Sequence, residues 1–163
     1  MILRDAVPGD VPALMTLWNQ QIRETAITFT TEEKTEEGLT AEIAACAREG
    51  RAFLVVEEGG VAIGLATWFA FRKGPGYAHT AEHTVVLAPS AQRHGTGRAL
   101  MGALEDHARQ AGIQVLVAAV TGENAAGRAF HLALGYCEVG YMPQVGRKFG
   151  RWMDLVLLQK QLR

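Results

Sequence analysis

A run of small residues between an apolar strand and a helix constrains this chain more than any other feature of its sequence. Residues 85–100 read VVLAPSAQRHGTGRAL, so an apolar stretch leads into a loop and then directly into a helical pattern. Such a loop can turn its backbone N–H groups toward an anion, and the N-terminus of the helix adds about half a positive charge. Arg93 and Arg98 add charged donors. The stretch therefore predicts a phosphate-binding loop, and a pyrophosphate fits it best.

Two common nucleotide-binding loops do not match this stretch. The dinucleotide fingerprint GxGxxG is absent, and no acidic residue follows at the expected distance in a second strand. The P-loop also fails, because no Lys-Ser or Lys-Thr pair follows the glycines. The remaining pattern, Gln-x-x-Gly-x-Gly after a strand, resembles the acetyl-CoA loop of the GCN5-related N-acetyltransferases. The alternative is a plain glycine-rich turn between a strand and a helix.

A second motif strengthens this resemblance. Residues 124–136 read NAAGRAFHLALGY and are similar to a later segment of the same superfamily, in which an Asn opens a helix and Gly-Phe or Gly-Tyr ends it. Residues 80–87 (TAEHTVVL), residues 142–155 (MPQVGRKFGRWMDL) and Ile27-Thr28-Phe29 narrow the resemblance to the phosphinothricin and methionine sulfoximine acetyltransferases. The segment at 142–155 resembles the methionine sulfoximine branch more than the phosphinothricin resistance enzymes.

The resemblance implies a cofactor site as well as a fold. It implies acetyl-CoA as the co-substrate, with Asn124 at the pantetheine amide and the glycine-rich loop at the phosphates. Backbone groups of residues 85–87 would hold the pantetheine arm. The cofactor-binding residues implied in this way are Val85, Val86, Leu87, Gln92, Arg93, His94, Gly95, Thr96, Gly97, Arg98 and Asn124.

The length and the hydrophobic pattern predict one domain that spans residues 1–163. Strands are expected at 2–6, 53–56, 61–71, 77–87, 115–120, 136–142 and 152–158. Helices are expected at 10–22, with Asp10 as its N-cap, and at 36–48, 97–111 and 125–134, with a loop at 25–31. The order β-α-α-β-β-β-α-β-α-β-β predicts an α/β fold: a mixed, mostly antiparallel central sheet with helices on both faces. The resemblance identifies this as the acyl-CoA N-acyltransferase fold.

Charge and composition exclude several classes of protein. With 16 Lys and Arg against 17 Asp and Glu, the chain has no basic excess with which to bind nucleic acid or an anionic membrane. The N-terminus has no signal-peptide core, and no apolar run is long enough to span a bilayer. Cys46 and Cys137 form no CxxC pair, so we expect them to be free thiols, as is typical of a protein in a reducing compartment. We therefore expect a cytoplasmic protein.

Glu82 is the expected catalytic base. Acetyl transfer needs a neutral amine, and a carboxylate in the middle of a strand is unfavourable unless it faces a polar cavity. The alternative for Glu82 is a salt bridge to a neighbour such as Arg72. A backbone N–H near Val86 would polarise the thioester carbonyl. His131 occupies the general-acid position of many superfamily members, and its alternative role is that of a half-buried histidine bonded to a backbone carbonyl.

An amino-acid-like acceptor needs a cation for its carboxylate, and Arg72 is the best candidate because its planar fork grips a carboxylate in two places. The other substrate-binding candidates are Phe29, Gly76, Tyr77, Glu82 and Lys148, although a solvated basic turn would also explain Lys148. No metal is expected. HExxH is absent, and His79 and His83 would lie roughly 13 Å apart on a strand.

The sequence thus favours an acetyl-CoA-dependent N-acetyltransferase for a small free α-amino compound such as methionine sulfoximine, methionine sulfone or phosphinothricin. Direct transfer in a ternary complex is expected, because no cysteine sits in the motifs as a covalent relay. One alternative is an acetyltransferase for a peptide N-terminus or a polyamine. Another is a non-catalytic CoA-binding sensor. The resemblance also implies a homodimer, with the C-terminal strands near the interface.

Overall fold

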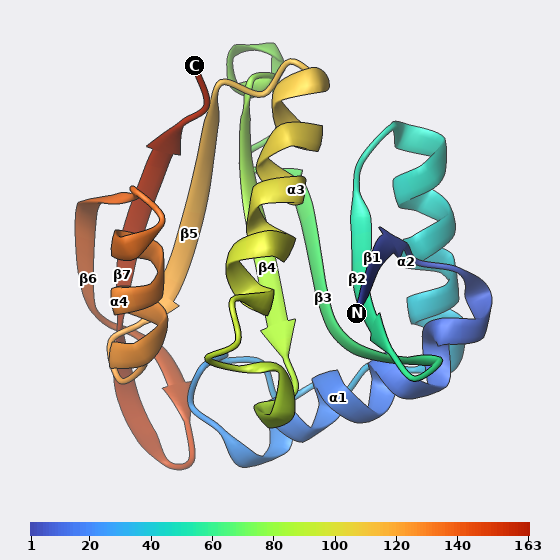
Figure 1. Ribbon diagram of the computed structural model, residues 1–163. Coiled ribbons are helices and arrows are strands. Elements are labelled where there is room, and N and C mark those ends of the chain that lie inside the picture. The colour runs from blue at the N-terminus through green and yellow to red at the C-terminus, as the bar shows by residue number, and fades with distance from the viewer.

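The computed structural model describes every residue from 1 to 163 and has the predicted order of elements (Figure 1). Single 3₁₀ turns lie at Pro8–Asp10, Pro75–Tyr77 and Pro89–Ala91. The strands and helices are β1 (Ile2–Asp5), α1 (Val11–Glu24), α2 (Glu36–Glu49), β2 (Phe53–Glu58), β3 (Val61–Ala70), β4 (Thr80–Leu87), α3 (Thr96–Gln110), β5 (Val115–Thr121), α4 (Ala125–Ala133), β6 (Cys137–Lys148) and β7 (Arg151–Gln161).

The strands form one seven-stranded sheet in the order β1-β2-β3-β4-β5-β7-β6. Every neighbouring pair is antiparallel except β4 and β5, which run parallel and are joined through α3. The mixed, mostly antiparallel sheet is therefore confirmed. Parallel strands need a crossover, and the helix of that crossover places the glycine-rich loop at the C-terminal end of β4.

Helices cover both faces of the sheet and bury a core on each. One core of 13 buried residues packs α1 and α2, through side chains such as Leu14, Trp18 and Leu39, against Val55, Leu65 and other sheet residues. The other, of 18 buried residues, packs α3 through Leu100, Met101 and Leu104 on the opposite face, and Phe130 of α4 packs against it. Figure 1 shows α3 and α4 in front of the sheet and α1 behind its lower end.

Local sequence signals explain several boundaries. Gly59 and Gly60 both have positive φ and form the two-residue turn between Glu58 and Val61, as a tight hairpin requires. The side chain of Thr35 accepts a hydrogen bond from the backbone N–H of Gly38 and so caps the start of α2.

Three expectations about the elements are wrong. Asp10 does not cap α1, because its carboxylate is taken up by Arg4 and by the backbone N–H of Val7. The strand expected from residue 77 begins at Thr80, because Pro75–Tyr77 forms a 3₁₀ turn. The last two strands are longer than expected and reach Lys148 and Gln161. Mutual pairing extends this hairpin beyond its apolar stretches, and a register shift between Met142 and Gly146 accommodates Pro143 in the edge strand.

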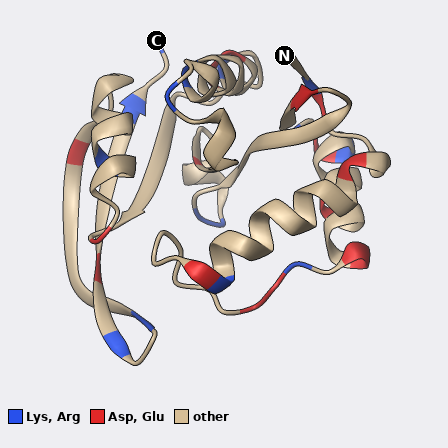
Figure 2. Ribbon diagram, turned by 60° about the horizontal axis from the view of Figure 1, so that its bottom comes forward, with Lys and Arg blue, Asp and Glu red and all other residues tan.

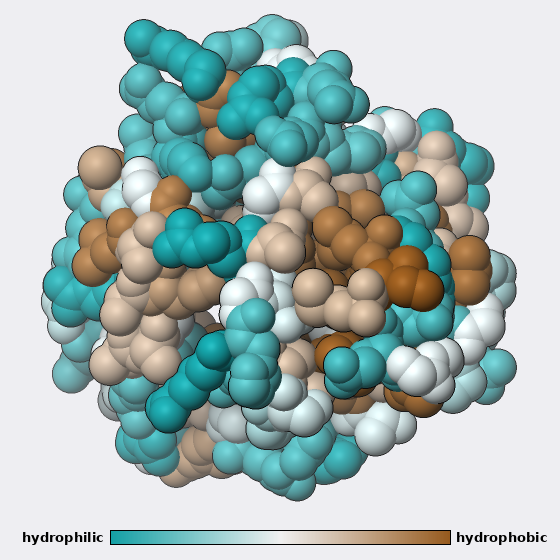
Figure 3. All heavy atoms as spheres, in the orientation of Figure 1, coloured by the Kyte–Doolittle hydropathy of each residue, from teal (hydrophilic) through white to brown (hydrophobic).

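The surface is mixed in charge. Figure 2 shows acidic and basic residues interspersed over the ribbon, with basic residues near the tip of the β6–β7 hairpin. In Figure 3, which views the face carrying α3 and α4, apolar patches alternate with hydrophilic ones. None of the helices is both long enough and apolar enough to span a membrane.

Candidate active site

An opening between the two parallel strands is the central feature of the site. β4 and β5 pair only at Thr80–Val115, Ala81–Leu116 and Glu82–Val117. On their other sides, β3 stays paired with β4 as far as Leu87, and β7 stays paired with β5 as far as Thr121. Beyond Glu82 the facing edges of β4 and β5 therefore lack a strand partner, and the two strands diverge toward the lower end in Figure 1. We call this opening the β4–β5 gap.

The unpaired edge of β4 can bind an extended ligand. Backbone N–H and C=O groups need hydrogen-bond partners when they are removed from water, and a ligand that carries amides can pair with a free strand edge. Val85, Val86 and Leu87 lie along this edge, next to the glycine-rich loop. Val86 packs its side chain into the core of α1 and α2, so its side chain serves the fold.

Glu82 lies at the closed end of the β4–β5 gap. Val86 and Ala81 belong to the cores on opposite faces of the sheet, and alternation along the strand places Glu82 on the Val86 face, which α1 and α2 cover. The Glu82 side chain is half-buried and forms no ion pair, so the expected alternative of a salt bridge to Arg72 does not occur. Burial raises the pKa of the Glu82 carboxyl above its ordinary value. A carboxyl group with these properties suits a general base.

The glycine-rich loop has the backbone geometry of an anion site. Arg93 and Gly95 both have positive φ, and Gly95 begins α3 without any side chain that caps the helix. The first N–H groups of a 15-residue helix are thus left to a ligand, and the helix dipole favours a negative one. Gly97 allows close packing here, since a Cβ at this position would lie 3.0 Å from Leu87 and 3.1 Å from Phe130.

The side chains of this loop are mostly exposed. Gln92, Arg93, His94 and Arg98 all face solvent, where they can reach a phosphate group. Arg98 also donates to the carbonyl of Ala133 at the end of α4, at 3.2 Å. The loop therefore offers the exposed guanidinium groups of Arg93 and Arg98 beside the backbone donors of the helix N-terminus.

Asn124 caps α4. Its Oδ1 accepts a hydrogen bond of 2.8 Å from the backbone N–H of Gly127, and a Cβ at position 127 would lie 2.3 Å from Asn124 Nδ2. The oxygen of this side chain is thereby engaged, whereas its amide nitrogen has no partner within the protein. The amide nitrogen can therefore donate to a carbonyl of a ligand at the end of β5.

His131 belongs to a buried cluster on the face opposite Glu82. Its Nδ1 is 2.7 Å from the carbonyl oxygen of Gly127, which can only accept, so Nδ1 carries the proton. Its ring stacks on His83, with centroids 5.0 Å apart, and packs edge-on against Tyr136. Burial lowers the pKa of both histidines, that of His83 to about 3. Neighbouring side chains on a strand point to opposite faces of the sheet, so Glu82 points away from His83. Because His131 stacks on His83, Glu82 and His131 lie on opposite faces.

The same cluster contains every buried side-chain polar atom that lacks a hydrogen-bond partner. Those atoms belong to His83, Glu105, His131 and Tyr136. Glu105 is itself paired with Lys160 at 2.6 Å. The sequence analysis did not find His83, Glu105 or Tyr136 as members of a common site, because they come from β4, α3 and the residue before β6, and only the tertiary structure brings them together.

The expected acceptor residues divide into two groups. Arg72, Gly76 and Tyr77 are exposed on the β3–β4 connection, at the closed end of the β4–β5 gap. Arg72 forms no ion pair, and its guanidinium lies 5.3 Å from the ring centroid of Phe71. Phe29 and Lys148 lie at the open end, where the segment that follows α1 contacts β6 and the end of β5.

The open end carries a loop between α1 and α2. Phe29 in this loop lies flat against Gly146 of β6, where a Cβ would come within 2.4 Å of the ring. Lys148 is 3% exposed, and its ammonium donates to the carbonyls of Thr25 and Thr28. Thr121, which the sequence analysis did not single out, donates to the carbonyl of Ala26. No sequence signal marks Thr121, because it is one of many β-strand threonines.

A family model and several known proteins match this chain. Residues 19–136 match the Acetyltransferase (GNAT) family model. The chain is 37% identical over 162 residues, or 99% of its length, to the L-amino acid N-acyltransferase MnaT of Escherichia coli, 94% of which is covered. It is equally 37% identical to an L-methionine sulfoximine/L-methionine sulfone acetyltransferase of Salmonella typhimurium, over 99% of this chain and 95% of that protein.

A phosphinothricin N-acetyltransferase of Streptomyces coelicolor is 33% identical over 98% of this chain and 95% of that protein. Among solved structures, an acetyltransferase from Salmonella typhimurium with its cofactor acetyl-CoA superposes with a TM-score of 0.95 at 37% identity. That match covers 100% of this chain and 94% of the other. The similarity therefore extends over the glycine-rich loop, the β4–β5 gap and the C-terminal hairpin.

Proposed function

The chain belongs to the acetyltransferase (GNAT) family, and from this premise we propose that it transfers the acetyl group of acetyl-CoA to the free α-amino group of a small amino-acid-like acceptor. The observation that carries the proposal is the β4–β5 gap, with Glu82 at its closed end and an uncapped helix N-terminus beside its open end. A fold that bound no CoA-like ligand would need neither feature, and Glu82 adds a group that can act as a base.

Acetyl-CoA fits the residues of this site. The N-terminus of α3 and the loop of Gln92, Arg93, His94, Gly95, Thr96, Gly97 and Arg98 would hold its pyrophosphate, and the free edge of β4 at Val85, Val86 and Leu87 would pair with its pantetheine amides. Asn124 would donate its amide to the same arm. When bound, acetyl-CoA supplies an activated acetyl group as a thioester.

In this proposal Glu82 removes a proton from the acceptor ammonium, directly or through one water, and the neutral amine would attack the thioester carbonyl. The C–N bond forms, the C–S bond breaks, CoA leaves as a thiolate, and the further proton that the nitrogen loses neutralises that thiolate. A backbone N–H of β4 near Val86 stabilises the oxyanion that develops. Transfer is direct in a ternary complex, since Cys46 is a buried residue of α2 next to Thr67 of β3 and Cys137 is exposed on the edge strand, so neither thiol lines the gap. His131 acts as a packing residue, because its Nδ1 is bound to Gly127 and its Nε2 is buried.

The acceptor class rests on the relatives and on Arg72. Proteins 33–37% identical to this chain act on methionine sulfoximine, methionine sulfone or phosphinothricin, all of which carry an α-amino and an α-carboxylate group. Arg72 is a cation with no carboxylate partner, two residues beyond Ala70, where the pairing of β3 with β4 ends next to Glu82. It would hold the acceptor carboxylate, with Tyr77 and Gly76 beside it.

A thiol-release assay with acetyl-CoA and a panel of amines tests the proposal. The panel contains methionine sulfoximine, methionine sulfone, phosphinothricin, ordinary amino acids, spermidine and an N-terminal peptide. Rapid CoA release with the first three, lost by about 10²–10⁴-fold in Glu82→Gln while acetyl-CoA still binds, is the expected result. Activity only on spermidine or the peptide would overturn the acceptor class, and binding of acetyl-CoA without turnover on any amine would indicate a sensor.

We also propose a homodimer that forms through the C-terminal hairpin. The edge strand β6 and the hairpin tip expose Tyr141, Met142, Val145, Phe149 and Trp152, each with 42–62% of its surface accessible. A row of exposed apolar side chains on an unpaired edge strand is typical of a surface that pairs with another chain. Light scattering after size exclusion should give twice the mass of 17.6 kDa; a monomer, with Tyr141→Lys unchanged, would contradict the proposal.

A further inference from the structure

Lys148 is a buried cation without an anionic partner. Its side chain is 3% exposed, and no carboxylate lies within 4.0 Å of its ammonium. Instead, Nζ donates hydrogen bonds of 2.7 Å to the carbonyl of Thr25 and 2.9 Å to the carbonyl of Thr28. Both acceptors belong to the segment that follows α1, which we call the α1–α2 loop (residues 25–35).

The N–H groups of its ammonium explain why a lysine occupies this buried position. Burying a charged group is costly unless hydrogen bonds replace its hydration, and burial does lower the pKa of Lys148. An ammonium offers three N–H donors and no acceptor, so it can bind several carbonyl groups at once. The two carbonyls it binds are three residues apart, which fixes both the position and the direction of the chain between them.

A second side chain holds the same loop independently. Thr121, the last residue of β5, donates through Oγ1 to the carbonyl of Ala26 at 2.6 Å. The ring of Phe29 lies against Gly146, where no side chain would fit. The side chains of Lys148, Thr121 and Phe29 thus join residues 25–29 of the α1–α2 loop to the ends of β5 and β6, although that part of the loop has no regular secondary structure.

The loop lies on the face of the sheet that carries Glu82, whereas α3, which would hold the phosphates of acetyl-CoA, covers the opposite face. Thr121 is at the end of β5 that has diverged from β4, so the loop borders the open end of the β4–β5 gap. It leaves α1, whose buried side chains share a core with Val86, so it lies on the Glu82 face of the sheet. Figure 1 shows it beside the β6–β7 hairpin at the lower end of the molecule.

We propose that Lys148 and Thr121 are positioning residues that hold the α1–α2 loop across the open end of the β4–β5 gap, and that Lys148 acts through this loop instead of binding the acceptor carboxylate itself. The inference rests on the proposed acetyltransfer. With the loop fixed, Phe29 is in place before the acceptor arrives, and less chain entropy is lost on binding. Without it, the loop must be ordered at each encounter, which weakens acceptor binding.

The experiment uses Lys148→Met, Thr121→Val and a matched control, Arg147→Met, in the full chain. Arg147 neighbours Lys148 on β6 but is exposed and lies over the ring of Trp152. Each variant is assayed with two acceptors, methionine sulfone and its carboxamide, which lacks the carboxylate. Hydrogen exchange of the amides of residues 25–29 is measured in the same proteins without any substrate.

Lys148→Met should raise the KM of both acceptors by the same factor, about tenfold, with the KM of acetyl-CoA within about twofold, and amide exchange in residues 25–29 should accelerate. Thr121→Val should change the same quantities in the same direction, and Arg147→Met should change none of them. A loss confined to the acceptor with a carboxylate, with exchange unchanged, would show that Lys148 binds the acceptor and would overturn the proposal. Unchanged exchange in both Lys148→Met and Thr121→Val would also overturn it.

Failure of the proposed function gives a different result. If the wild-type protein turns over neither acceptor, the acetyltransfer proposal fails for this class, while the exchange measurement still reports whether Lys148 and Thr121 hold the loop. If Lys148→Met does not fold, Thr121→Val carries the test, because a threonine-to-valine change keeps the shape of the side chain and removes only the hydroxyl donor.

Discussion

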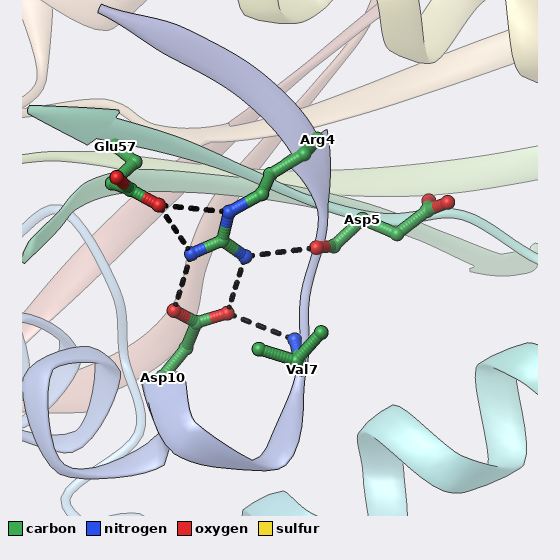
Figure 4. A network of polar contacts seen from close by, with 5 residues as sticks. All are labelled: Arg4, Asp5, Val7, Asp10 and Glu57. Carbon is green, nitrogen blue, oxygen red and sulfur yellow. Dashed lines mark hydrogen bonds and ion pairs between the residues drawn. The ribbon is translucent and has the colours of Figure 1, made fainter. Parts of the chain in front are cut away.

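Replacing Arg4 by methionine should destabilise the protein through the carboxylate that it leaves behind. Arg4 donates to both oxygens of Asp10 at 2.8 Å, and to Glu57 at 2.8 and 2.9 Å (Figure 4). These contacts join β1, β2 and the turn that begins α1. The Asp10 side chain is only 8% exposed, and its one other partner is the backbone N–H of Val7.

The size of the effect depends on how much of each partner is buried. Breaking a fully buried ion pair costs about 3–5 kcal/mol, and breaking an exposed pair costs about 0–1 kcal/mol. The Arg4 side chain is 29% exposed, but Asp10 would remain buried and charged. We therefore expect Arg4→Met to lower the free energy of unfolding by about 2–3 kcal/mol, between the two limits. For a chain of this size that corresponds to a fall in Tm of about 5–10 °C.

The pH dependence of this loss has a definite sign. Hydrogen bonding to Arg4 lowers the pKa of Asp10 below 3.8 in the folded state. A lowered carboxyl pKa contributes stability that is fully present above pH 3.8 and is lost as the pH falls through the folded-state value. The difference between wild type and Arg4→Met should therefore be constant near neutral pH and shrink in strongly acidic solution.

Urea unfolding of a double-mutant cycle measures the interaction. The cycle contains Arg4→Met, Asp10→Ala and the double variant, with Arg128→Met as a control that breaks the exposed pair with Glu138. The double variant should lose less stability than the sum of the single variants, by at least about 1 kcal/mol. The control should lose less than about 1 kcal/mol. An Arg4→Met loss as small as the control, or a coupling energy near zero, would refute the reasoning.

Three further predictions concern the site and its surroundings. Because burial raises the pKa of Glu82, the fall of kcat/KM with decreasing pH should begin above the pH at which an ordinary glutamate titrates, and a pH–rate profile should lose this limb in Glu82→Gln. Gly97→Val should lose about 1–3 kcal/mol in urea unfolding and weaken acetyl-CoA binding in calorimetry, since its first added carbon would lie 3.0 Å from Leu87; unchanged binding would contradict the placement of the pyrophosphate. Burial lowers the pKa of His83 from 6.5 to about 3, so stability should fall as the pH drops from 6.5 toward 3, and His83→Leu should flatten that dependence in urea midpoints measured at each pH.

The order and type of the secondary-structure elements were predictable because their causes are local. The spacing of apolar residues, the glycines of tight turns and the caps of helices each depend on residues close together in the sequence, as at the Gly59-Gly60 hairpin and at the start of α2. The glycine-rich loop was equally predictable, because a strand, a loop and a helix N-terminus that follow one another make an anion site without help from distant residues. Glu82 was predictable as a candidate base, because a carboxylate in the middle of a strand is unfavourable unless it faces a polar cavity.

What the sequence could not show depends on groups that meet only after folding. Asp10 looks like a helix cap until Arg4 is placed beside it, and the length of β6 depends on its pairing with β7. The stacking of His83 on His131 joins residues from β4 and α4 across the core.

The sequence alone predicted the family, the fold class, a general base in one strand and an anion site in one loop, since short runs of neighbouring residues carry these signals. Only the tertiary structure decided that β4 and β5 part after Glu82, that His131 lies on the other face, and that the ammonium of Lys148 is spent on the α1–α2 loop. The physical reason is that burial and hydrogen-bond partners are properties of the assembled surroundings, and a residue type fixes neither.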